Sequence, residues 1–98
     1  MVISIKELAE QYFQNAVKIL AEQELLKNDY EKARDAAMIL LMDREKLEAI
    51  LEKIALQYGG CVSCCYSRPY PGAPVKLLAR SCALGLNQEG CRKWERIR

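Results

Sequence analysis

The cysteines of this chain are confined to its last 38 residues, and this distribution constrains the fold more than any other sequence feature. Cys61, Cys64 and Cys65 stand together, Cys82 and Cys91 follow, and the first 60 residues contain no cysteine. Segments below about 40 residues usually need a metal, disulfides or a partner in order to stay folded. We therefore expect a small C-terminal module that is held by its cysteines and carried on a larger N-terminal region.

The cysteine spacing predicts a four-cysteine metal site. Cys61 forms a C-x2-C pair with Cys64 and a C-x3-C pair with Cys65, and either spacing in a turn can place both sulfurs on one metal. Cys82 and Cys91 provide the second pair, although zinc ribbons usually return with another C-x2-C and this pair has eight residues between its members. The predicted ligands are Cys61, Cys64, Cys82 and Cys91, with Cys65 as the alternative to Cys64.

Three interpretations of the cysteines remain open. The first is a structural Zn²⁺ site, which would supply the folding energy that a small module lacks. The alternative is a [4Fe–4S] cluster, which is larger than one ion and tolerates ligands from loops of unequal length. The third is metal-free thiols, either buried or paired in disulfides. Histidine is absent from the chain, which excludes imidazole ligands.

The order of the cysteine ligands is similar to that of high-potential iron–sulfur proteins and of the cluster-binding small subunits of some enzymes. This resemblance covers only the last third of the chain, and it depends on ligand order alone. It implies electron transfer by a bound cluster, which Tyr66, Tyr70 and Trp94 could shield from water.

The first 58 residues have the apolar spacing of helices. Ser4 followed by Glu7 predicts a capped helix over about residues 4–26. A second helix is expected to begin near Asn28 or Asp29. Its buried line is predicted to consist of Ala33, Ala37, Leu40 and Leu41.

A third helix is expected to begin at Asp43, after a break near Met42, although one long helix over residues 29–58 is the alternative. Its apolar stripe is formed by Leu47, Ile50, Leu51, Ile54 and Tyr58. Gly59-Gly60 ends it, because glycine takes the left-handed conformation of a helix C-terminus without steric cost. The fold class is therefore mostly α: a two- or three-helix N-terminal bundle (1–58) followed by a small irregular four-cysteine metal-binding module (59–98).

The two regions differ in charge. Residues 1–58 have eight Lys or Arg against eleven Asp or Glu, a net of −3, whereas residues 59–98 have seven against two, a net of +5. A basic module with aromatic residues is typical of a surface that binds nucleic acid or an acidic protein. The predicted contact residues are Arg68, Lys76, Arg80, Arg92, Lys93 and Trp94.

These features predict a small non-enzymatic adaptor or regulator with a structural zinc site. An iron–sulfur accessory or electron-transfer subunit is the alternative, and a thiol redox protein using Cys61 with Cys64 or Cys65 is the third. The thin helical region could form a homodimer. The sequence has no signal-peptide pattern and no apolar run of membrane-spanning length, so we expect a cytoplasmic protein with reduced thiols that does not enter a membrane.

Overall fold

The first helix begins where the sequence predicts, at a serine cap. In the computed structural model α1 spans Ile5–Ala21, and the Ser4 hydroxyl accepts a hydrogen bond from the backbone N–H of Glu7 at 3.2 Å. The structure describes residues 2–22, 30–70, 76–86 and 91–98. The helix ends at Ala21, earlier than predicted, and residues 23–26 lie outside the described ranges.

The next two helices are separate, which confirms the break near Met42 and excludes a single long helix. α2 spans Tyr30–Leu41 and α3 spans Arg44–Gln57. Asp43 caps α3, because its carboxylate accepts a hydrogen bond from the backbone N–H of Glu45 at 3.3 Å. The caps predicted for the second helix, Asn28 and Asp29, lie outside the described residues.

The buried face of α2 is not the predicted one. Ala36 and Ile39 are buried, whereas Leu41 is 87% exposed, so its assignment to the core was wrong. The other predicted positions are only partly buried: Ala33, Ala37 and Leu40. Apolar residues continue from 36 to 42 and therefore occupy every face of this helix, so its packing against α1, and not the pattern, decides which side chains are covered.

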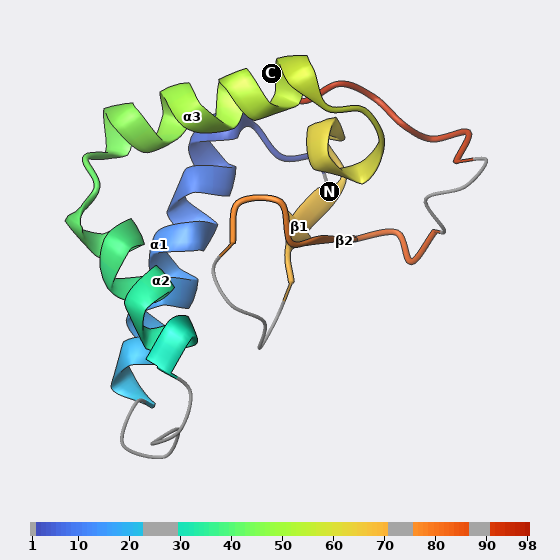
Figure 1. Ribbon diagram of the computed structural model, residues 1–98. Helices are drawn as coiled ribbons and strands as arrows, with labels where there is room; N and C mark the ends of the chain where they lie inside the picture. The colour runs from blue at the N-terminus through green and yellow to red at the C-terminus, as the bar shows by residue number, and fades with distance from the viewer. Residues whose placement is uncertain (1, 23–29, 71–75, 87–90) are drawn as a thin grey trace.

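α1 is the centre of the helical region. It packs against both α2 and α3, and Figure 1 shows α2 beside it and α3 crossing near its N-terminal end. The apolar stripes of the predicted helices supply most of this core, in agreement with a mostly helical fold. Its fully covered side chains include Leu8, Tyr12, Ala16, Leu47 and Leu51.

The glycines after α3 act differently from the prediction. The helix ends at Gln57, and Tyr58 and Gly59 are already extended, with φ of −115° and −96°. Gly60 has the left-handed φ of +73° and begins the 3₁₀ turn η2 (Gly60–Ser63). The left-handed glycine therefore redirects the chain into the first cysteine turn and does not cap the helix.

A short antiparallel hairpin follows η2. β1 (Ser67–Pro69) pairs with β2 (Arg80–Cys82), and Ser67 stands opposite Cys82. The chain before Arg80 forms a turn, closed by a hydrogen bond of 3.0 Å from Ala79 N–H to the Lys76 carbonyl. The hairpin contacts α1 through β1.

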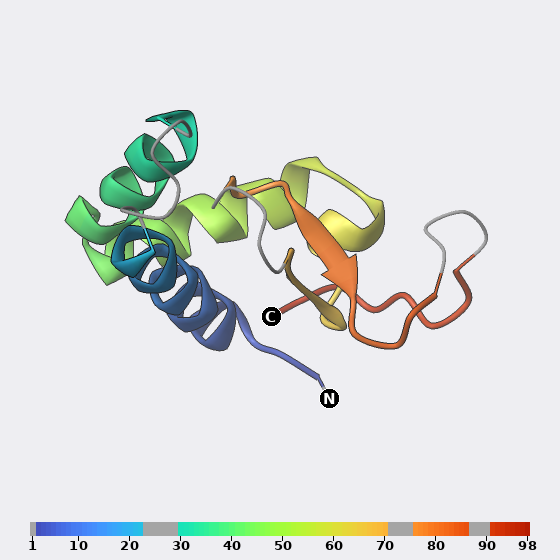
Figure 2. The ribbon, with the colours of Figure 1, turned by 90° about the horizontal axis from the view of Figure 1, so that it is seen from below.

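The C-terminal segment fastens the cysteine region to the helices. Cys65 N–H donates to the Glu95 carbonyl, Ile97 N–H to the Ser63 carbonyl and Ile3 N–H to the Cys65 carbonyl, each at 2.8 Å. Cys65 and Ile97 belong to the same hydrophobic core as the helices, so the core continues across the predicted boundary at residue 58. Figure 2 shows the C-terminal segment returning beside the start of α1.

Among the helices in the described ranges, none has the length and apolar character needed to cross a membrane.

Candidate metal centre

Four cysteines line one cavity beside the hairpin. The cavity has a volume of about 300 Å³, and Cys61, Cys64, Cys82 and Cys91 are all part of its wall. These four residues are the ones that the sequence predicts as ligands, and Cys65, the alternative to Cys64, is not among the residues of the wall. The remaining lining residues are Gly60, Tyr66, Ser67, Leu84, Lys93 and Trp94.

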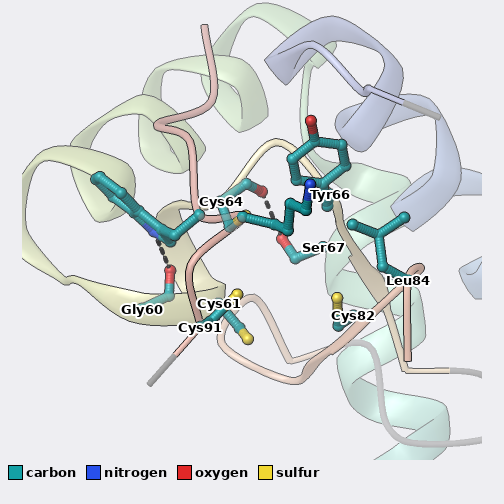
Figure 3. A pocket seen from close by; sticks show the side chains of 10 residues that line it. Gly60, Cys61, Cys64, Tyr66, Ser67, Cys82, Leu84 and Cys91 are labelled. Carbon is teal, nitrogen blue, oxygen red and sulfur yellow. Dashed lines mark hydrogen bonds between the residues drawn. The ribbon is translucent and has the colours of Figure 1, made fainter. Parts of the chain in front are cut away.

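The four cysteines reach the cavity from three segments of the chain. Cys61 lies in η2, Cys64 directly follows it, and Cys82 ends β2. Cys91 opens the C-terminal segment 91–98. Figure 3 shows the cysteines arranged around the same space, with Cys82 across from Cys61 and Cys91. No disulfide joins the five cysteines.

Cys65 lies on the other side of the backbone. Cys64 is extended, with φ of −87° and ψ of 139°, and neighbouring side chains in extended chain point to opposite sides. Cys65 is therefore directed into the core, where it is 3% exposed and its Sγ lies 3.8 Å from a carboxylate oxygen of Glu95. Burial, with the nearby Cys64 and Glu95, raises the pKa of the Cys65 thiol, which favours the protonated form.

Hydrogen bonds hold the first cysteine turn in place. The Ser67 hydroxyl donates to the Cys64 carbonyl at 2.8 Å, and the Ser63 hydroxyl donates to the Gly60 carbonyl at 3.2 Å. The indole N–H of Trp94 donates to the same Gly60 carbonyl at 2.7 Å, as Figure 3 shows. The turn that carries Cys61 and Cys64 is thus tied both to the hairpin and to the C-terminal segment.

Arg80 is buried next to this turn and is only 9% exposed. Its Nε donates to the Tyr12 hydroxyl at 3.4 Å, and its Nη1 donates to the Val62 carbonyl and to the Ser67 hydroxyl. Its Nη2 is buried and has no hydrogen-bond partner. Tyr12 in turn donates to the Leu77 carbonyl at 2.7 Å, and burial raises the pKa of this phenol although the Arg80 charge opposes the rise.

The other residues predicted to contact a partner are on the surface or close to it. Arg68 is half-buried, and its guanidinium donates to the carbonyls of Cys65 and Ser67 at 3.1 and 3.0 Å. The exposed members of the set are Lys76, Arg92, Lys93 and Trp94. Arg80 does not share this surface, because it lies inside the molecule.

The C-terminal segment brings cations and an aromatic ring to the edge of the cavity. Lys93 and Trp94 belong to the cavity wall, and the guanidinium carbon of Arg96 lies 5.5 Å from the centre of the Trp94 ring. Arg96 also donates to the Ala55 carbonyl at the end of α3. The aromatic ring is therefore held between the first cysteine turn and a fixed guanidinium.

The sulfurs surround a space and do not converge on a point. In the described part of the chain, no three cysteine or carboxylate side chains form a set that could hold a single metal ion as they stand. Sequence reasoning also missed Ser67 and Leu84 as part of the site. Ser67 could have been found from its position opposite Cys82 in the hairpin. The sequence does not give this register, because the strands are only three residues long.

In comparisons with protein-family models, with curated proteins and with solved structures, no match to this chain was found.

Proposed function

We propose that this protein binds an iron–sulfur cluster through Cys61, Cys64, Cys82 and Cys91 and serves as an accessory or electron-transfer protein. The observation that carries the proposal is that these four cysteines line one cavity of about 300 Å³. Four cysteine thiolates are the usual ligand set of a [4Fe–4S] cluster. The remaining cysteine, Cys65, is directed into the core and is not part of the ligand set.

The size of the cavity favours a cluster over a single ion. Tetrahedral Zn²⁺ with bonds of about 2.3 Å draws its four sulfurs to within about 3.8 Å of one another, which fills the space between them. Six further residues share the cavity wall with the four cysteines, and in the described part of the chain no three donors form a set for one ion. In a [4Fe–4S] cluster, the iron and sulfide atoms lie between the cysteine sulfurs and would occupy such a space.

The chemistry of the wall also suits a metal–thiolate centre. Tyr66, Leu84 and Trp94 supply apolar surface, and Lys93 supplies a positive charge. The described lining includes no carboxylate. Because four thiolates around a cluster leave about two net negative charges, a wall with one cation and without carboxylates would stabilise the loaded site.

Elemental analysis and a UV–visible spectrum of protein purified without oxygen test the proposal. We expect iron and inorganic sulfide in equal amounts, about four of each per chain, together with a brown colour that fades in air. One zinc per chain and no colour would refute the cluster and restore the structural zinc site. A protein that holds neither metal would refute both.

Two adjacent cysteines give a matched pair for the ligand assignment. Cys64→Ser is expected to lose most of the iron, because its sulfur is part of the cavity wall. Cys65→Ser is expected to keep the iron and to be less stable, because it places a hydroxyl in the core. If Cys64→Ser retained the iron and a folded Cys65→Ser lost it, the ligand would be Cys65 and the assignment to Cys64 would be refuted.

A second function rests on the surface around Trp94. Arg92, Lys93 and Trp94 are exposed, the last two belong to the cavity wall, and the Arg96 guanidinium lies over the Trp94 ring. Cations next to an exposed aromatic side chain suit a single-stranded nucleic acid, in which the phosphates meet the cations and a base meets the ring. The adaptor role expected from the sequence is in this way compatible with a cluster in place of zinc.

Anisotropy of a labelled single-stranded oligonucleotide measures this binding. We expect an affinity that falls with salt and that drops about tenfold in Trp94→Ala. Lys53→Gln, which removes an exposed charge from α3, is the control and should bind like the wild type. Equal binding to polyglutamate would identify an acidic protein as the partner instead. A homodimer through residues 1–58 stays a prediction, which light scattering can test.

A further inference from the structure

Arg80 is a buried cation whose charge has no counter-ion in the described structure. Its hydrogen-bond acceptors are a phenol, a carbonyl and a hydroxyl, from Tyr12, Val62 and Ser67, and all three are neutral. Elsewhere on the molecule, an ion pair joins Arg44 to Glu10. A buried charge is costly unless an opposite charge compensates it.

Two of the three hydrogen-bond partners of Arg80, Val62 and Ser67, belong to the segments that carry the cysteines. Val62 lies between Cys61 and Cys64, and Ser67 is part of the cavity wall. Arg80 and Cys82 are two residues apart in β2, so their side chains are on the same face of the strand. Ser67, which stands opposite Cys82 in the hairpin, accepts a hydrogen bond from Arg80 Nη1 at 3.4 Å.

We infer that the Arg80 guanidinium is the internal counter-charge of the centre that Cys61, Cys64, Cys82 and Cys91 hold, and that it sets the reduction potential of that centre. This inference rests on the proposed cluster. The described residues around the guanidinium supply no anion, and a thiolate-bound cluster would supply one. Arg80 is a positioning residue in this role, because it touches the cysteine turn and not the reacting atoms.

The sign of the effect follows from charge. Each electron that a mediator dye delivers adds one negative charge to the cluster and its thiolates. A nearby fixed cation stabilises the more negative, reduced form and so raises the potential. Removing the cation lowers the potential, and low solvent exposure keeps water and salt from screening the change.

A mediated potentiometric titration of the purified cluster protein tests the inference. Arg80→Met should lower the midpoint so that the ratio of reduced to oxidised cluster at a fixed potential falls at least tenfold, which is about 59 mV for one electron. Arg80→Lys keeps the charge and should stay close to the wild type. Lys53→Met removes an exposed charge on α3 and should not shift the midpoint.

The outcomes separate this inference from the proposed function. A wild-type protein without iron and sulfide overturns both. A cluster whose potential is the same in Arg80→Met overturns the inference alone. Where Arg80→Met fails to hold a cluster, retention of the cluster in Arg80→Lys supports the role of charge. Loss of the cluster in both variants overturns it and leaves Arg80 as a hydrogen-bonding residue only.

Discussion

Replacing Tyr12 by Phe removes the hydroxyl that joins α1 to the cysteine region. This hydroxyl donates to the Leu77 carbonyl at 2.7 Å and accepts from Arg80 Nε at 3.4 Å, and Tyr12 is 0% exposed. The substitution leaves a carbonyl and a buried charged donor without these partners. Buried groups left unsatisfied cost about 1–3 kcal/mol, so we expect the free energy of unfolding to fall by about 2 kcal/mol.

The assay is thermal and urea unfolding followed by far-UV circular dichroism, on protein kept anaerobic and at one metal content. For a chain of this size a loss of that magnitude lowers Tm by about 8–16 °C. Tyr58→Phe is the control, because Tyr58 is 49% exposed and its hydroxyl is available to water. If Tyr12→Phe stayed within about 0.5 kcal/mol of the wild type, the hydroxyl would not be the link between the two regions.

Three further predictions follow from the same structure. Gly60→Ala should destabilise the protein by about 1–2 kcal/mol, because the φ of Gly60 is +73°. Gly59→Ala should be nearly neutral, because the φ of Gly59 is −96° and no atom lies within 4 Å of the added carbon. Equal effects of the two substitutions in unfolding experiments would contradict this difference in backbone conformation. Leu47→Ala should cost about 2–5 kcal/mol in urea unfolding and Leu41→Ala less than about 0.5, and the reverse order would place Leu41 back in the core. Burial raises the pKa of Tyr12 above 10.0, so the folded protein holds the phenol proton more tightly than the unfolded chain does. This contribution to stability should be complete below pH 10 and should be lost as the pH rises beyond it. Measured as a function of pH, Tm should therefore fall less in Tyr12→Phe than in the wild type.

The sequence was most informative where a single residue decides the local structure. Ser4 and Asp43 accept the hydrogen bonds of helix N-terminal caps, and both helices begin at the next residue. A cap depends on one side chain and one backbone N–H nearby, so sequence alone can reveal it. The face of α2 needed tertiary information, because apolar residues surround that helix and only packing against α1 selects Ala36 over Leu41.

The cysteines of the candidate site could be predicted from the sequence, but the directions of their side chains and the residues around them could not. Spacing alone left Cys64 and Cys65 equivalent, and the extended backbone between them is what directs one to the cavity and the other to the core. Arg80 was predicted to lie on the basic surface of residues 59–98, because that region has a net charge of +5. Its burial depends on Tyr12 and Val62, which are far from it in the chain, and no local pattern encodes such a contact.

The pairing of Cys65 with Glu95 requires the chain to close a long loop. The two residues are 30 positions apart, and the backbone bond between them forms only after the chain has closed that loop. Loop closure of this length costs chain entropy before any contact offsets it. Cys61 and Cys64 can meet early within one turn, but Cys91 is delivered only when the C-terminal segment docks. A cofactor that met the chain before this docking would therefore find at most three of the four proposed ligands.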